Sequence, residues 1–131
     1  MGTLDSLIED GRAASVLGEA GPFAQRIDNY VVRESQVAMA SAIEQTIADK
    51  QTLLAESGTG TGKTFAYLVP ALLSAKKTLV STGTKHLQEQ LFHRDIPLVL
   101  ESLGMNSKVS LLKGRSTVSY THLTLPTILL V

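Results

Sequence analysis

A glycine-rich run ending in lysine and threonine is the part of this sequence best suited to chemistry. Residues 56–64 read Glu-Ser-Gly-Thr-Gly-Thr-Gly-Lys-Thr. Glycines let successive backbone N–H groups turn inward toward a polyphosphate, which larger side chains would obstruct. Lys63 would then reach the β- and γ-phosphates of a nucleotide, and the Thr64 hydroxyl would coordinate Mg²⁺. The run predicts a P-loop with nucleotide contacts from Ser57, Gly58, Thr59, Gly60, Thr61, Gly62, Lys63 and Thr64.

One position departs from the general P-loop pattern. The usual first glycine, five places before Gly62, is replaced by Ser57. A flexible Gly/Thr linker is the alternative interpretation of the run. A linker has no need of Gly-Lys-Thr at the start of a helix, so the run favours a phosphate-binding loop.

The segments on either side of the run have the order that a P-loop needs. Residues 52–55, Thr-Leu-Leu-Ala, predict a short apolar strand before it, and a helix is expected from Lys63 to about residue 73. The helix N-terminus adds unpaired N–H groups and the positive end of its dipole. Pro70 has no N–H for the preceding turn, but the apolar residues on both sides favour a helix that continues through it.

Further elements of both kinds alternate along the chain. Apolar residues at helical spacing predict a helix over residues 34–49. Residues 78–81 predict a buried parallel strand, and residues 109–112 predict a further strand. Between these strands two helices are expected, the first over residues 85–92. The second begins near Asp95, a capping residue or solvated charge, and stops at Gly104.

This alternation predicts an α/β fold with a parallel sheet flanked by helices. Ligands of such sheets bind at the carboxyl ends of the strands. The P-loop and residues 82–84, Thr-Gly-Thr, both follow a predicted strand, so both are expected at that edge.

The composition limits the function more weakly. The 131 residues fit one domain, and a 44% apolar content is typical of a globular protein. Twelve basic and twelve acidic residues give no net charge, so any nucleic-acid contact must be local. No cysteine is present, and neither a signal peptide nor a membrane span is recognised, so a cytoplasmic location is expected.

Four stretches together resemble the DinG/XPD-type superfamily 2 ATP-dependent DNA helicases, most closely their bacterial YoaA/DinG branch. These stretches are RESQVAMASAI, LLAESGTGTGKTFAYLVPAL, LVSTGTKHLQEQL and LLKGRS, in the family's order and spacing. Ala or Ser often stands at the position of Ser57 in this family. The resemblance implies a partial RecA-like P-loop domain over residues 33–116, preceded by an N-terminal lead-in at residues 1–32.

The resemblance also implies the functional residues. Arg33 and Gln36 match an R-x-x-Q element near the adenine, whose N6/N7 edge suits a glutamine amide. The family's motif Ia touches the backbone of single-stranded DNA, and hydroxyl and backbone N–H groups are suitable donors to its phosphate oxygens. Motif Ia corresponds here to Ser81, Thr82, Gly83, Thr84 and Gln88.

The implied activity is ATP hydrolysis coupled to 5′-to-3′ movement along single-stranded DNA, with ATP and Mg²⁺ as cofactors, in DNA repair. The family's iron–sulfur cluster would need cysteines, and this chain has none. The Asp-Glu-x-His motif and the second RecA-like domain with its arginine finger are also missing. We therefore expect an N-terminal helicase fragment that binds nucleotide but is inactive alone.

Two other functions are weighed against this one. An unrelated P-loop ATPase or nucleotide kinase should bring an acceptor-binding segment and mobile arginines, whereas residues 81–91 offer a Thr/Gly/Gln-rich pattern instead. A non-functional remnant that binds nothing is the third possibility. His86, His93 and His122 have no metal-ligand spacing and are expected to be ordinary surface residues.

The end of the chain departs from the family at residue 117. Residues 118–127 read Val-Ser-Tyr-Thr-His-Leu-Thr-Leu-Pro-Thr and match a translated transposon-end adapter from sequencing libraries. A native β-strand followed by a proline turn is the alternative, because Val, Tyr and Thr favour strands. The coincidence of the family break with the adapter match predicts that residues 117–131 are a non-native tail that packs poorly.

Overall fold

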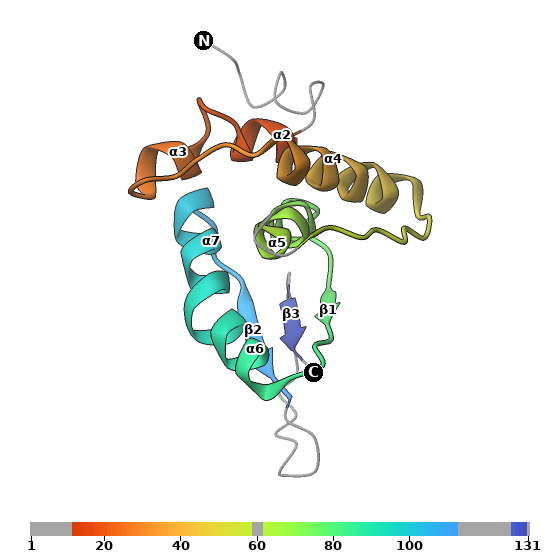
Figure 1. Cartoon of the computed structure of the whole chain (residues 1–131). Helices are drawn as coiled ribbons and strands as arrows, with labels where there is room; N and C mark the ends of the chain where they lie inside the picture. Colours follow the sequence, from red (N-terminus) through yellow and green to blue (C-terminus); the bar gives the residue numbers. More distant parts are fainter. Residues whose placement is uncertain (1–11, 59–61, 113–126, 131) are drawn as a thin grey trace. The chain divides into compact units, whose positions relative to one another are not determined.

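The computed structural model describes residues 12–58, 62–112 and 127–130 (Figure 1). The chain divides into two compact units, Met1–Ser74 and Ala75–Val131. The predicted P-loop lies in the first unit, and the predicted DNA-contacting segment lies in the second.

The described part of the first unit is helical. Its helices are α2 (Arg12–Leu17), α3 (Pro22–Arg26), α4 (Glu34–Asp49) and α5 (Lys63–Leu73). Helices α4 and α5 pack against each other, and α2 contacts both. The Ala13 N–H at the start of α2 donates to Glu44 Oε2 of α4 at 2.9 Å, which ties the two helices together. The predicted helix over residues 34–49 is confirmed.

Helix α5 carries much of the buried apolar surface of this unit. Leu68 and Val69 are fully buried, as are Leu17 of α2 and Phe23 of α3. The helix continues through Pro70, as predicted, and the Pro70 carbonyl accepts the Ser74 N–H at 3.0 Å. The buried apolar residues around the proline offset the backbone hydrogen bond that it cannot donate.

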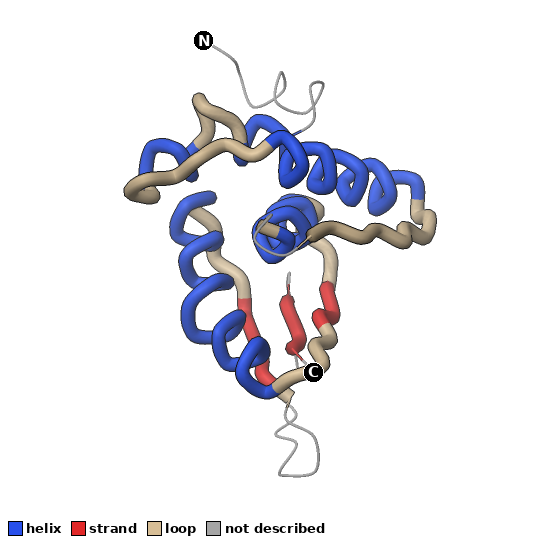
Figure 2. The backbone as a smooth tube through the Cα atoms, viewed as in Figure 1, coloured by secondary structure: helices blue, strands red, loops and turns tan. Residues whose placement is uncertain are grey.

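The prediction of a strand at residues 52–55 is wrong. Residues 51–58 form the extended loop between α4 and α5 (Figure 2). Leu53 is 41% exposed and Leu54 is 99% exposed, so this apolar segment has no covering partner. A strand needs a neighbouring edge to pair with, and the described residues of the first unit contain no strand.

The second unit combines strands and helices. Its elements in order are β1 (Thr78–Val80), α6 (Lys85–Gln90), the π-helical turn η1 (Leu91–Asp95), α7 (Ile96–Leu103), β2 (Lys108–Leu111) and β3 (Thr127–Leu130). The strands form a parallel sheet in the order β1-β3-β2, visible in Figure 1. Leu129 pairs with Leu79 on one side and with Ser110 on the other. The predicted strands at residues 78–81 and 109–112 are found within one residue of those bounds. The expectation that residues 78–81 are buried is wrong, because Leu79 is 62% exposed.

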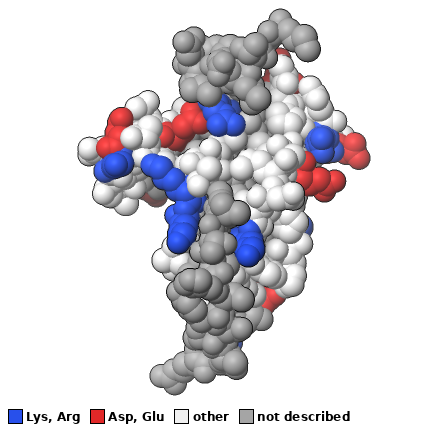
Figure 3. Space-filling view, turned by 180° about the vertical axis from the view of Figure 1, so that it is seen from behind, with Lys and Arg blue, Asp and Glu red and all other residues white. Residues whose placement is uncertain are grey.

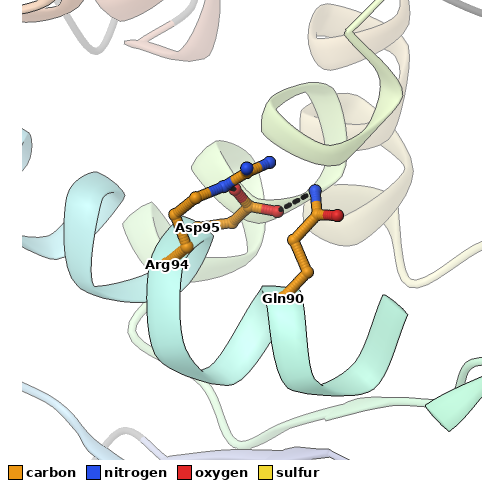
Figure 4. Close-up of polar contacts among 3 residues, drawn as sticks. All are labelled: Gln90, Arg94 and Asp95. Carbon is orange, nitrogen blue, oxygen red and sulfur yellow. Dashed lines mark hydrogen bonds and ion pairs between the residues drawn. The ribbon is translucent and has the colours of Figure 1, made fainter. Parts of the chain in front are cut away.

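The two helices predicted between β1 and β2 are in fact continuous. The π-helical turn joins α6 to α7, and Asp95 has helical backbone angles and caps nothing. Asp95 is 4% exposed, and its carboxylate accepts from Gln90 Nε2 at 3.3 Å and from Arg94 Nε at 3.2 Å (Figure 4). The expectation that Asp95 caps a helix or is solvated is therefore wrong, because the residue is buried and makes no capping hydrogen bond. The donors from Gln90 and Arg94 compensate the burial of its carboxylate. Helix α7 ends at Gly104 in the left-handed conformation, as predicted.

Strand β3 lies within the tail predicted to be non-native. The expectation that this tail packs poorly is wrong for Thr127–Leu130, whose backbone pairs with strands on both sides. Main-chain pairing uses only N–H and C=O groups, so an extended segment of any origin can fill an open strand edge. Residues 113–126, with most of the adapter match, lie outside the described residues. The origin of the tail stays a prediction.

Among the described residues visible in Figure 3, neither sign of charge dominates. Lys and Arg side chains and Asp and Glu side chains form small separate groups between uncharged areas. This agrees with the formal net charge of zero. Within the described ranges, no helix is long and apolar enough to cross a membrane.

Candidate nucleotide-binding site

The predicted P-loop ends at the start of α5. Gly62 stands at the N-cap with φ 79° and ψ 35°, in the left-handed region that favours glycine. Lys63 and Thr64 form the first turn of the helix, whose leading N–H groups have no partner within the helix. Thr59, Gly60 and Thr61 lie outside the described residues.

Lys63 joins the two ends of this loop. Its Nζ donates to the Ser57 carbonyl oxygen at 3.0 Å, although the two residues are six positions apart. The lysine side chain is exposed. A neutral carbonyl is a weaker partner for an ammonium group than a phosphate oxygen is, so an anion in the loop would compete for this contact.

Gln36 of α4 fixes the last residue of the loop. Its Nε2 donates to the Gly62 carbonyl at 3.0 Å, and the same carbonyl accepts the Ala66 N–H at 3.2 Å. A Cβ atom on Gly62 would collide with the Gln36 amide nitrogen. Because the C=O and N–H of one peptide point in opposite directions, holding the Gly62 carbonyl also turns the Lys63 N–H away from the helix, toward the loop.

Tyr30 is a part of this arrangement that the sequence did not reveal. Its hydroxyl donates to the Leu17 carbonyl at 2.8 Å and lies 3.4 Å from Gln36 Oε1. Burial raises the pKa of Tyr30 above its ordinary value, while the positive charge of Arg33 acts in the opposite direction. The hydroxyl therefore stays protonated and able to donate at neutral pH. Its position before α4 gave no signal, because these contacts join three separate segments.

The other residues predicted to contact nucleotide are Arg33, Gln36 and Thr64, and they differ in exposure. Arg33 is the N-cap residue of α4, and its exposed side chain makes no capping hydrogen bond. Thr64 is half-buried, one residue after Lys63. Gln36 is only 4% exposed, and both ends of its amide face protein groups. The structure thus brings Gln36 to Gly62 and Lys63 to Ser57.

The predicted DNA-contacting segment precedes α6 in the second unit. Ser81, Gly83 and Thr84 are exposed, and Thr82 Oγ1 donates to the Thr84 carbonyl at 3.3 Å. Thr84 caps α6, since its Oγ1 accepts the Leu87 N–H at 3.2 Å. These exposed residues are open to a ligand.

Gln88, assigned to the same segment, is buried instead. It is 5% exposed, and its Nε2 donates to the Leu112 carbonyl at 2.9 Å. The amide nitrogen thus holds the chain at the end of β2 and does not point into solvent.

The histidines show no metal site within the described ranges. His86 and His93 are exposed, as predicted, and His93 Nε2 lies 2.9 Å from Glu89 Oε2 one turn earlier. No group of three or more His, Cys, Asp or Glu residues gathers there. His122 falls outside the residues that the structure describes.

A known protein family matches most of this chain. The profile of the family described as "DEAD/DEAH box helicase" matches residues 36–129. The chain belongs to the DEAD/DEAH box helicase family. This membership implies a RecA-like α/β fold and makes a nucleotide kinase the weaker alternative.

Curated relatives point to one branch of this helicase family. The chain is 46% identical over 107 residues to the ATP-dependent DNA helicase YoaA of Haemophilus influenzae, covering 82% of this chain and 17% of the relative. It is 51% identical over 96 residues to YoaA of Escherichia coli, covering 73% and 15%. The ATP-dependent helicase DinG of Mycobacterium tuberculosis is 42% identical over 91 residues, covering 63% and 14%.

The chain thus spans about a sixth of the length of these helicases. No solved structure matches it.

Proposed function

We propose that this chain is the nucleotide-binding part of the motor domain of an ATP-dependent DNA helicase. Residues 33–116 would form this part, with residues 1–32 as a lead-in and residues 117–131 as a non-native tail. The main support is the Lys63 contact with Ser57, which sets a cationic side chain across a loop that leads into a helix N-terminus. Family membership and the YoaA relatives support the same activity.

In this proposal the loop from Ser57 to Lys63 binds the phosphates of ATP. The Lys63 Nζ would exchange the Ser57 carbonyl for phosphate oxygens, which form stronger, charge-assisted hydrogen bonds. The Lys63 N–H already points toward the loop, because Gln36 holds the preceding carbonyl. The Thr64 hydroxyl, in the first turn of α5, would hold Mg²⁺, which neutralises phosphate charge when bound.

The adenine would lie near the start of α4, where Arg33 and Gln36 stand. After its contacts with Gly62 and Tyr30, the Gln36 amide keeps one N–H and one oxygen lone pair. One donor and one acceptor are what the N6/N7 edge of adenine requires. Because Gln36 is 4% exposed, this contact would need the side chains over the amide to move aside.

The intact protein would move along single-stranded DNA in the 5′-to-3′ direction. Ser81, Gly83 and Thr84 would contact the DNA backbone, since they are exposed and carry hydroxyl or N–H donors. Thr82 would support this segment through its hydrogen bond to the Thr84 carbonyl. Gln88 would support the same segment indirectly, through its hydrogen bond to the Leu112 carbonyl.

We also propose that the intact protein contains a RecA-like parallel sheet flanked by helices, of which β1 and β2 would be part. Ligands of such a sheet bind at the carboxyl ends of its strands, and residues 82–84 follow that end of β1. An iron–sulfur cluster does not fit the residues present, because the sequence contains no cysteine.

The Lys63→Ala variant tests the proposed function. Loss of the charge-assisted phosphate contact should weaken binding of a fluorescent Mg-ATP analogue by on the order of 1.5–3 kcal/mol, or about ten- to a hundredfold. Lys50→Ala is the matched control, since it removes an exposed lysine at the other end of the α4–α5 connection. Equal affinity in the wild type and Lys63→Ala would contradict the proposal.

A further inference from the structure

Tyr30 connects the lead-in to the nucleotide site. It precedes the residues matched by the helicase family, which begin at Gln36. Its hydroxyl bonds the Leu17 carbonyl at the end of α2 and lies within reach of Gln36 Oε1, while Gln36 Nε2 bonds the Gly62 carbonyl. Three successive polar contacts thus run from α2 to the residue before Lys63.

We propose that Tyr30 is a positioning residue of the nucleotide site, whose hydroxyl orients the Gln36 amide and thereby the peptide between Gly62 and Lys63. The inference rests on the proposed nucleotide binding at this loop. It assigns a functional part to a residue outside the region that the family match covers.

The orientation of the Gln36 amide follows from the groups around it. The Gly62 carbonyl can only accept, so the Nε2 end of the amide must face it, and Oε1 is left facing Tyr30. A flipped amide would set two oxygen acceptors against each other at Gly62. Gln36 is almost fully buried, so an Oε1 atom without a donor would destabilise this orientation.

The Tyr30 ring is held separately from its hydroxyl. Its ring centroid lies 6.1 Å from that of Phe23, which is fully buried. Phe23 in turn stacks on Phe65 of α5 at 5.3 Å, two residues after Lys63. Because the ring has its own packing, Tyr30→Phe removes the hydroxyl and keeps the aromatic contacts.

The hydroxyl proton is shared between two acceptors with different consequences. The shorter contact, at 2.8 Å to Leu17, stabilises the fold of the lead-in, and the longer one, at 3.4 Å, acts on Gln36. A structural role through Leu17 does not depend on Gln36, whereas a positioning role does. This difference makes the two roles separable by a double-mutant cycle.

The test combines Tyr30→Phe and Gln36→Ala, singly and together, with binding of a fluorescent Mg-ATP analogue. Tyr30→Phe should weaken binding about three- to tenfold when Gln36 is present and less than twofold when it is not. The loss of unfolding stability should be similar in both backgrounds. Thr46→Val is the control, since it removes another hydroxyl that donates to a backbone carbonyl of α4, at 2.7 Å. It should leave affinity unchanged.

Hydrogen exchange in the nucleotide-free protein gives a second measurement. Exchange at the first turn of α5, where the Ala66 N–H bonds Gly62, should rise in Tyr30→Phe and in Gln36→Ala. Unchanged exchange in Tyr30→Phe, or equal affinity losses with and without Gln36, would overturn the positioning role. If exchange responds but the wild type binds no Mg-ATP, the contact stands, and the proposed function and the part of Tyr30 in it are both overturned.

Discussion

A side chain at Gly62, the end of the P-loop, would have two effects, a collision and backbone strain. Comparing Gly62 with Gly104 and Gly83 separates these two effects. Gly62 combines a φ of +79° with no room for a Cβ atom, because the Gln36 amide stands against it. Gly104 has a φ of +64° but open space around its Cβ position. Gly83 has open space and no such φ. Alanine therefore adds both a collision and backbone strain at Gly62, backbone strain alone at Gly104, and neither at Gly83.

The expected losses follow from these differences. A left-handed conformation costs an alanine about 1–2 kcal/mol, which is the loss expected for Gly104→Ala. In Gly62→Ala the Gln36 amide must also move, and its broken hydrogen bond in a buried position adds about 1–3 kcal/mol. Gly62→Ala should thus lower the free energy of unfolding by about 2–5 kcal/mol. Gly83→Ala should change it by no more than about 0.5 kcal/mol.

Urea unfolding followed by circular dichroism measures these losses. Hydrogen exchange then assigns each loss to its unit, because Gly62 and Gly104 lie in different ones. The second arm repeats Gly62→Ala in a Gln36→Ala background, where the colliding atoms are gone. There the loss should fall to that of Gly104→Ala. A Gly62→Ala loss no larger than that of Gly104→Ala, or no relief by Gln36→Ala, would refute the packing of Gln36 on the loop.

The remaining predictions concern catalysis and the tail. The 131-residue chain should show no ATPase activity stimulated by single-stranded DNA, because its sequence lacks the residues that position water and stabilise charge in phosphoryl transfer. Phosphate release that rises with single-stranded DNA and vanishes in Lys63→Ala would contradict this. Independent amplification of the source DNA across the codon for Ser116 should give an open reading frame leading toward cysteine codons. Recovery of the same codons for residues 118–127 would end the adapter hypothesis.

The helices were predictable because local patterns determine them. The apolar spacing over residues 34–49 gave α4 with its bounds, and the Gly-Lys-Thr sequence gave the start of α5. A strand was predicted at residues 52–55 but is not formed in the structure. An apolar run becomes a strand only if the edge of another strand is available to pair with it. Strand β3 shows the same dependence, since its partners β1 and β2 are distant in sequence.

The residues of the candidate site can be selected from the sequence, but the contacts between them cannot. The P-loop pattern identified Lys63, and the family resemblance identified Gln36. Neither could show that Lys63 bonds the Ser57 carbonyl and Gln36 the Gly62 carbonyl. Asp95 illustrates the limit in another way. A continuous helix with a π turn buries its carboxylate, and no local pattern announces such a turn.

Two glutamines assigned to ligands by resemblance donate to backbone carbonyls in the structure. Gln36 is 4% exposed and holds Gly62 at the P-loop, and Gln88 is 5% exposed and holds Leu112 at the end of β2. Loss of binding in Gln36→Ala would therefore report both the misplaced loop and any lost contact with adenine. Comparing ATP with GTP separates the two effects. A misplaced Gly62 weakens both nucleotides alike, since their phosphates are identical. A lost contact with the N6/N7 edge weakens ATP more than GTP, because guanine shares the N7 acceptor but has no N6 donor.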